Sequence, residues 1–310
     1  MTPIRILYFT MNLSDFTFQN REYFKQTLAG RPDVRVHFEE SGGDIGPLLD
    51  RLPFTPDFIY IDAFVDRFRK TLTDLNKTTI PKGIMHTDPF RKTSLFKTFV
   101  RSNKIDLVFS YYRDGFLNEY PEFAKKFRWL PHHAYTPMFK DYALPKTIDF
   151  LLMGSLSPIY PLRNKIARDM RDVPGFVHHE HPGYRLFSKE EQQHLPIKQN
   201  YAKEINRARI FLTDGSMYNY PVAKYFEVPA CNTLLLASGA RELTDLGFID
   251  KQNFVAVTEA DFYDKAMHYL HKEDKRIEIA LKGHRLVAEH HSTEIRVGQF
   301  IDYIRSHLQR

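Results

Sequence analysis

Apolar residues along this chain alternate between short continuous runs and longer segments in which they recur at helical spacing. In the first half, five runs have the length of buried strands: residues 4–9, 34–38, 58–61, 83–86 and 107–110. Four segments between them carry apolar residues every three or four positions: residues 20–28, 45–52, 95–103 and 116–127. Strands that alternate with helices predict right-handed βαβ units around a parallel sheet. The first half is therefore predicted to be one doubly wound domain.

The second half repeats this alternation. Its predicted strands are residues 150–153, 175–178, 210–213, 233–237 and 254–257, and its predicted helices are residues 162–171, 199–207, 260–271 and 275–290. Weak periodicity and two prolines mark residues 135–147 as a linker. We therefore expect an α/β protein with domains at residues 1–145 and 146–291, and an amphipathic helix within residues 292–310. Ligands of such sheets bind beyond the carboxyl ends of the strands, so two domains are expected to face a shared cleft.

Composition narrows the class of protein. The 310 residues suffice for two domains, and 43% hydrophobic and 26% charged residues are ordinary for a globular chain. No apolar stretch reaches the roughly 20 residues of a membrane span, and the N-terminus resembles a strand rather than a signal peptide, so we expect a cytoplasmic protein. The single cysteine, Cys231, excludes an internal disulfide. A net charge of +6 favours anionic partners without choosing among nucleotides, lipid surfaces and nucleic acids.

Residues 224–232, which read Lys-Tyr-Phe-Glu-Val-Pro-Ala-Cys-Asn, carry the most specific chemistry. They are typical of a short helix and a tight turn that lead into a buried strand. Lys224 and Glu227 are three positions apart and share one helix face, where the carboxylate could accept the hydroxyls of a ribose and the ammonium could bind a phosphate. An exposed ion pair of the same spacing is the alternative.

This segment resembles the corresponding stretch of CgeB-like glycosyltransferases, which are relatives of the family-4 group of enzymes that use nucleotide sugars. Further signals follow in the order of that family: residues 149–155, 160–163, 201, 246–248, 253–255 and 291–296. The resemblance implies the GT-B fold, with two Rossmann-like domains and a last helix that crosses back to the first domain. It also implies a nucleotide diphosphate sugar as donor, held by the second domain, and neither a cofactor nor a metal.

The donor-binding residues that the resemblance and the residue pattern suggest lie after strands or on the following helices. They are Gly154, Ser155, Arg163, Asn219, Lys224 and Glu227. Gly154 after an apolar strand would let the backbone approach a diphosphate, and Arg163 at a helix start would add positive charge. A turn glycine and a surface arginine are the alternative interpretation.

The chain departs from the family pattern at two positions. Asn219 stands eight residues before Glu227, where family-4 enzymes usually carry a second glutamate that touches the donor sugar. Asn232 stands where the family usually has glycine. Because asparagine tolerates a positive φ better than other non-glycine residues, we expect the turn to survive.

Candidates for the acceptor side follow the strands of the first domain: Asn12, Asp15, His86, Asp88, Tyr111 and Arg113. His86 or Asp88 could deprotonate an acceptor hydroxyl as the catalytic base, although residues 86–89 are also a good loop sequence that starts a helix. Neighbouring histidines at 132–133, 178–181 and 290–291 do not follow a known metal-ligand spacing, so no metal site is predicted.

The sequence thus predicts a metal-independent glycosyltransferase that moves a sugar from a nucleotide diphosphate sugar to the hydroxyl of a glycan or a lipid-linked acceptor, with peripheral membrane contact left open. One alternative is a non-catalytic nucleotide- or glycan-binding protein on the same fold. A second is a glycosyltransferase that acts on nucleic acid, which only the basic charge supports. A Rossmann oxidoreductase is disfavoured because no G-x-G-x-x-G motif follows residues 4–9 or 150–153.

Overall fold

The computed structural model describes residues 2–309, with the backbone alone for Asp66 and Arg67. The chain forms two compact units. Unit 1 comprises residues up to Ser14, residues Arg21–Pro131 and residues from Glu294 onwards, whereas unit 2 comprises Asp15–Asn20 and His132–Thr293. Among the described residues, no helix combines the length and the apolar character needed to cross a membrane.

Unit 1 is built on a six-stranded sheet in the order β2-β1-β4-β6-β7-β8. Its strands, all parallel, are β1 (Ile4–Phe9), β2 (Val34–Glu39), β4 (Phe58–Ile61), β6 (Lys82–Met85), β7 (Leu107–Ser110) and β8 (Phe127–Trp129). A separate two-stranded sheet pairs β3 (Gly43–Asp44) with β5 (Leu72–Thr73). The parallel order confirms the predicted doubly wound topology.

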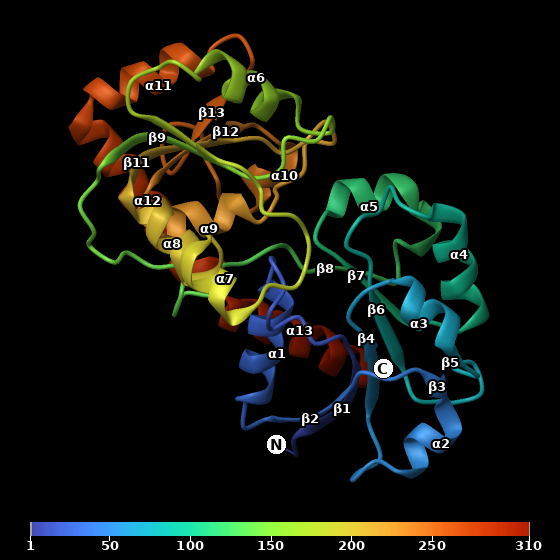
Figure 1. Ribbon diagram of the computed structural model, residues 1–310. Coiled ribbons are helices and arrows are strands. Elements are labelled where there is room, and N and C mark those ends of the chain that lie inside the picture. Colours follow the sequence, from blue (N-terminus) through green and yellow to red (C-terminus); the bar gives the residue numbers. More distant parts are fainter. Residues whose placement is uncertain (1, 310) are drawn as a thin grey trace. The chain divides into compact units, whose positions relative to one another are not determined.

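Helices cover both faces of the unit 1 sheet (Figure 1). The helices of this unit are α1 (Asn20–Ala29), α2 (Ile45–Asp50), α3 (Asp66–Thr71), α4 (Thr93–Ser102), α5 (Arg113–Glu119), the 3-10 turn η1 (Pro121–Phe123) and α13 (Thr293–Leu308). Helix α13 packs on the sheet through Phe300, whose ring centroid lies 4.7 Å from that of Tyr60 on β4 and 5.3 Å from that of Phe109 on β7. The C-terminal helix therefore belongs to the core of unit 1.

Unit 2 has a five-stranded parallel sheet in the order β10-β9-β11-β12-β13. Its strands are β9 (Ile148–Met153), β10 (Phe176–His179), β11 (Ala208–Thr213), β12 (Leu234–Ser238) and β13 (Val255–Val257). Its helices are α6 (Pro161–Asp169), α7 (Lys189–His194), α8 (Lys198–Arg207), α9 (Lys224–Ala230), α10 (Arg241–Asp245), α11 (Phe262–His271) and α12 (Glu273–His290). Side chains of α6, α11 and α12 form one buried cluster with the strands. Helix α12 also packs on α9, and α8 lies beside α9 (Figure 1).

Two details of the predicted elements are wrong. The helix predicted over residues 116–127 ends at Glu119, because Pro121 has no amide hydrogen to continue it, and the residues beyond form η1 and the edge strand β8. The short elements α3, α7, α10, β3 and β5 were not predicted, since each is too short to show a period. The domain boundaries at residues 145 and 291 stay a prediction.

Candidate functional site

The candidate site of unit 2 lies at the point where the order of its strands reverses. From β9 the chain continues to β10 on one side, and from β11 it continues to β12 on the other side, yet β9 and β11 are neighbours. Loops that leave such a pair diverge and open a space at the carboxyl edge of the sheet. Gly154 and Ser155 follow β9 there, and Asp214 follows β11.

Gly154 brings the backbone next to two cationic side chains. Its φ of +136° lies in a region that side chains disfavour. A Cβ placed on it would lie 3.0 Å from Cε of Lys224 and 3.1 Å from Nη1 of Arg163. A larger residue would therefore displace one of these cations, and the three predicted residues Gly154, Arg163 and Lys224 do lie together.

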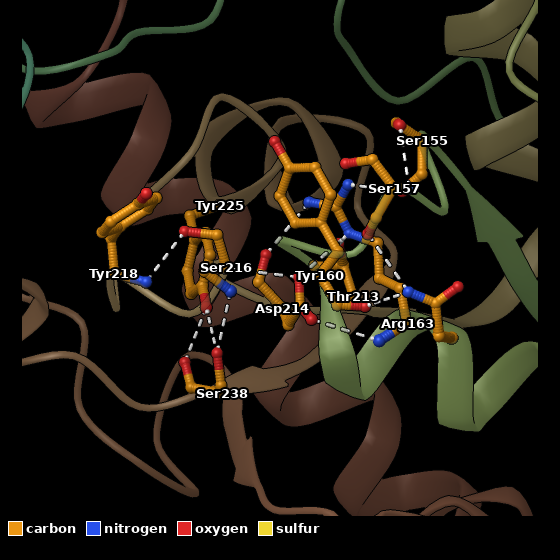
Figure 2. A network of polar contacts seen from close by, with 12 residues as sticks. Ser155, Ser157, Tyr160, Arg163, Thr213, Asp214, Ser216, Tyr218, Tyr225 and Ser238 are labelled. Atoms are coloured by element: carbon orange, nitrogen blue, oxygen red, sulfur yellow. Dashed lines mark hydrogen bonds and ion pairs between the residues drawn. The ribbon is translucent and has the colours of Figure 1, made fainter. Parts of the chain in front are cut away.

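Arg163 is held by the loops around it (Figure 2). Its guanidinium donates from Nε to Oγ1 of Thr213 over 2.9 Å and from Nη2 to the carbonyl of Asp214 over 3.1 Å. Nη1 lies 3.4 Å from the carbonyl of Ser155, and the guanidinium carbon sits 3.7 Å from the ring centroid of Tyr160. Only 3% of Arg163 is exposed. The side chain therefore ties β9, α6 and β11 together.

Asp214 balances the charge of Arg163. Its Oδ1 lies 3.2 Å from Nε of Arg163, and its Oδ2 accepts the backbone N–H of the same residue over 3.1 Å. Burial raises the pKa of Asp214, while the charge of Arg163 and the backbone hydrogen bonds oppose that rise. The carboxylate also occupies the first turn of α6, so the start of this helix is capped by protein rather than open to a ligand.

Lys224 is the second cation beside Gly154, and it has no carboxylate within ion-pair distance among the described residues. It is half-buried, its Nζ lies 5.5 Å from the ring centroid of Tyr201, and it donates no hydrogen bond to any residue that the structure describes. Burial and then the charge of Arg163 lower the pKa of Lys224 to about 8, and Glu227 opposes this shift. An ammonium in this setting gains from an anionic partner.

Glu227 follows Lys224 by one turn of α9, as the spacing predicted. Its Oε2 accepts a hydrogen bond of 3.1 Å from the hydroxyl of Tyr201 on α8. Burial raises the pKa of Glu227, and Lys224 and Tyr201 oppose the rise. Within residues 2–309, Oε1 receives no hydrogen bond, so one carboxylate oxygen keeps its capacity to accept hydroxyls.

The other two predicted donor-site residues lie in loops. Ser155 follows Gly154, and its hydroxyl accepts the backbone N–H of Ser157 over 3.2 Å. Asn219 lies in the loop between β11 and α9, is exposed, and has a φ of 54°. Its side chain makes no hydrogen bond to a described residue, so the structure does not bring Asn219 into the cluster of Arg163 and Lys224.

The two predicted catalytic residues follow β6 in unit 1. His86 is buried, stacks on Phe96 at 4.1 Å, and has Nε2 2.9 Å from the hydroxyl of Tyr120. Burial lowers the pKa of His86 to about 4, which keeps the imidazole neutral near neutral pH. Asp88 is half-buried and accepts the hydroxyl of Thr87 over 3.3 Å. His86 has the surroundings of a core residue, and the catalytic role of both residues stays a prediction.

The predicted acceptor-side residues separate into the two units. In unit 1, Asn12 is exposed, Tyr111 is buried with its carbonyl accepting the indole of Trp129, and Arg113 lies 4.7 Å from the ring centroid of that tryptophan. Asp15 lies in unit 2 instead.

Asp15 is tied to the helices of unit 2. Lys189 approaches its carboxylate to 2.6 Å, and Gln192 donates to it over 2.9 Å. These two hydrogen bonds lower the pKa of Asp15 to about 2. Its acceptor-binding role stays a prediction, and its observed contacts are structural.

One buried polar group of unit 1 was not among the predicted site residues. Asp62, directly after β4, is 1% exposed, accepts the hydroxyl of Thr10 over 2.5 Å, and pairs with Arg21 over 3.2 Å. Burial raises the pKa of Asp62, and Arg21 opposes the rise. Thr10 and Asp62 follow β1 and β4, the neighbouring strands where the order of this sheet reverses. The signal was present, since Asp62 follows the apolar run 58–61 directly.

Metal ligation finds no support in side-chain clusters. Within the described part of the chain, no group of three or more His, Cys, Asp or Glu side chains could hold an ion. Two of the histidines that neighbour another histidine in the sequence have protein partners instead. His179 contacts Glu204 over 2.8 Å, and His291 contacts the carbonyl of Leu246 over 2.7 Å. Metal independence of a reaction stays a prediction.

Comparisons with known proteins agree on fold and family. The family model for glycosyl transferase-like proteins matches residues 144–302, just over half of the chain. No curated protein matches the sequence significantly. Among solved structures, HepE of Anabaena in complex with UDP superimposes with a TM-score of 0.66 at 11% identity, covering 98% of this chain and 100% of that one.

Two further structures are similar over nearly their whole lengths. Sucrose-phosphate synthase from Thermosynechococcus elongatus has a TM-score of 0.69 at 13% identity, with 99% of each chain covered. A glycosyltransferase from Rickettsia africae has a TM-score of 0.63 at 10% identity, with 100% of each chain covered. These likenesses confirm the predicted GT-B fold with Rossmann-like domains.

Proposed function

This chain belongs to the glycosyl transferase-like family, and we propose that it transfers a sugar from a nucleotide diphosphate sugar to an acceptor hydroxyl. The observation that carries the proposal is the ammonium of Lys224, which lies beside the backbone of Gly154 and donates no hydrogen bond to a described residue. A diphosphate is the ligand that such a pair suits, because it brings negative charge and needs close backbone approach. The ordered similarity of residues 149–296 to CgeB-like enzymes supports this subgroup as a further prediction.

In this proposal Lys224 binds the diphosphate and Glu227 accepts the ribose hydroxyls. Arg163 contributes mainly by position: it fixes Ser155 and Asp214 on either side of the site and adds a charge that Asp214 largely balances. The ammonium would stabilise the departing diphosphate, so we propose a transfer that needs no metal ion. Activity unchanged by a chelator would support this, and activity restored only by a divalent cation would contradict it.

Calorimetric titration with UDP tests the assignment of the two residues. UDP is the first probe because HepE, which has the same fold, was crystallised with UDP and with UDP-glucose. Lys224→Ala should raise the dissociation constant about ten- to a hundredfold, as expected when a charged hydrogen bond is lost. Lys203→Ala, an exposed lysine on α8, is the matched control. Equal affinities of parent and Lys224→Ala would contradict the assignment.

The ribose contact has its own test. The parent should bind UDP about tenfold more tightly than the 2′,3′-dideoxy analogue, because Glu227 would lose both hydroxyl partners. In Glu227→Gln this preference should shrink, whereas in Glu190→Gln, an exposed glutamate of α7, it should persist. An undiminished preference in Glu227→Gln would place the ribose elsewhere.

A non-catalytic binding protein on the same fold is the second candidate. The observation that favours it is the state of His86, whose ring is enclosed by Phe96 and Tyr120 rather than free to accept a proton. Release of sugar or UDP from UDP-glucose by the purified protein would exclude it. The acceptor, whether glycan or lipid-linked, and the cytoplasmic location stay predictions.

A further inference from the structure

His181 is the histidine of residues 178–181 that the site described so far does not use. It follows β10 by two residues, as Ser155 follows β9, and the two strands pair with His179 opposite Met153. His181 therefore follows the strand that neighbours β9, at the same carboxyl edge of the unit 2 sheet as Gly154. The imidazole is half-buried and packs against Tyr184, with ring centroids 4.5 Å apart.

The tautomer of His181 is determined by its own loop. The backbone N–H of Gly183 donates to Nδ1 over 3.0 Å, so Nδ1 is an acceptor and the neutral ring carries its hydrogen on Nε2. Within residues 2–309, Nε2 has no hydrogen-bond partner. His179, two residues earlier, differs because its Nε2 already contacts Glu204.

The loop that carries His181 is anchored within unit 2. The backbone N–H of Thr17 donates to the carbonyl of Arg185 over 3.2 Å, and the N–H of Phe187 donates to the carbonyl of Asp15 over 2.8 Å. The hydroxyl of Thr17 donates to the carbonyl of Gly183, whose N–H holds the imidazole. These bonds fix the direction of the imidazole before any ligand binds, which reduces the ordering cost of binding.

The charges around His181 are those of the proposed diphosphate site. Burial, and after it the charges of Lys224 and Arg163, lower the pKa of His181 to about 4. The imidazole is therefore a neutral donor within electrostatic range of two cations. A group of that kind suits a phosphate oxygen, which accepts hydrogen bonds and brings negative charge close to the two cations.

We propose that the Nε2–H group of His181 donates a hydrogen bond to the diphosphate of the nucleotide donor, as a phosphate ligand additional to Lys224. The inference rests on the proposed function and adds a binding residue from the β10 loop. It also gives a role to residues 15–20, which hold this loop in place.

Calorimetric titrations of nucleotide and nucleoside near neutral pH test the inference. The probes are the tightest-binding of UDP, ADP, GDP and dTDP, and the corresponding nucleoside. His181→Ala should raise the dissociation constant of the diphosphate about tenfold and leave that of the nucleoside unchanged. His181→Gln, whose amide nitrogen can take the place of Nε2, should retain affinity within about threefold of the parent. His179→Ala is the matched truncation and should bind both probes like the parent.

The outcomes separate the two proposals. Equal diphosphate affinity of parent and His181→Ala, together with a loss in Lys224→Ala, would overturn the role of His181 and leave the proposed function standing. No binding of any diphosphate by the parent would overturn both. Should His181→Ala fail to fold, spectra of isotope-labelled histidine in the parent decide, since the Nε2 resonance of His181 should shift with the diphosphate and stay in place with the nucleoside.

Discussion

Lys224 and Arg163 both lie against Gly154, yet their surroundings give them different tasks. Arg163 is paired with Asp214 and donates to Thr213 and to main-chain carbonyls, so its charge is balanced inside the protein. Lys224 lacks such partners among the described residues, and its pKa of about 8 records the cost of holding that charge. A ligand that supplies the counter-charge recovers this cost, and Lys224 is therefore the cation from which binding affinity should come.

The lowered pKa of Lys224 predicts a specific dependence of UDP binding on pH. Bound phosphate would raise the pKa of Lys224, so binding takes up a proton wherever the free ammonium has lost one. From about pH 7 to about pH 9 the dissociation constant should rise by about tenfold, while the terminal phosphate, with a second pKa of about 6, is already mostly ionised. Titrations across this range check it. Lys224→Ala should bind weakly at every pH, and the same slope in that variant would show that another group titrates.

Single residues of the site could be predicted where the chemistry is local. Lys224 and Glu227 are three positions apart on one helix, so their spacing alone predicted that they share a face. The pairing of Arg163 with Asp214 joins residues 51 positions apart, and no local pattern reveals it. For His86, the Tyr120 ring that encloses it comes from a later segment of the chain.

At the scale of elements, the turn from α9 to β12 is the feature where sequence and structure agree most closely. Asn232 has a φ of 52°, as predicted from its place in the motif. Its side chain donates to Asp141 over 2.9 Å, and its carbonyl accepts from Lys146 over 3.0 Å. The turn aligns α9 with the sheet, and α9 carries both Lys224 and Glu227.

This turn yields a prediction for two substitutions of one residue. Asn232→Ala should destabilise the protein by about 1–2 kcal/mol, because alanine disfavours the left-handed conformation and loses the contact with Asp141. Asn232→Gly loses the same contact but relieves the backbone, so its cost should stay below about 1 kcal/mol. Urea unfolding of the two variants provides the comparison. Equal midpoints would mean that the side-chain contact, and not the backbone, determines stability here.

The alternating elements were predictable because central strands such as β4, β7 and β12 are nearly continuous apolar runs, as is usual for parallel strands covered on both faces. Short edge elements were not. The strand β8 has three half-buried residues, Phe127 to Trp129, and shows no period that distinguishes it from the end of a helix.

At the scale of the whole molecule, unit 1 depends on residues from both ends of the sequence. Phe300 of α13 is fully buried and touches Phe24, Tyr60 and Phe109. Arg305 on the same helix pairs with Asp33 over 2.7 Å. The last helix is therefore part of the core that stabilises the first sheet, while the nucleotide site proposed above lies in unit 2.

This division predicts a separation of stability from binding. Phe300→Ala should cost about 3–5 kcal/mol of stability, as for other buried phenylalanines, and should leave the dissociation constant of UDP within about twofold of the parent at a temperature where the protein stays folded. Thermal unfolding and calorimetry measure the two quantities. A parallel loss of UDP affinity would show that the nucleotide site depends on unit 1.

The periodicity of apolar residues predicted two doubly wound domains. The family resemblance predicted a last helix that returns to the first domain. The grouping of residues 15–20 with unit 2 shows no signal in these patterns. Their attachment to unit 2 rests on hydrogen bonds between positions more than 160 apart, such as Thr17 with Arg185, and such contacts leave no local trace.

The chain passes from one unit to the other four times, after Ser14, Asn20, Pro131 and Thr293, and this connectivity governs how the protein can fold during its own synthesis. All strands of the first sheet have been synthesised once Trp129 has been added, but the aromatic face around Tyr60 and Phe109 stays uncovered until Phe300 follows. At usual translation rates that interval is on the order of ten to thirty seconds. We expect ribosome-bound chains arrested after residue 290 to be cleaved readily by protease within residues 21–131, and chains released with α13 to resist. Protease resistance in chains arrested after residue 290 would mean that the first sheet is stably folded before α13 packs on it.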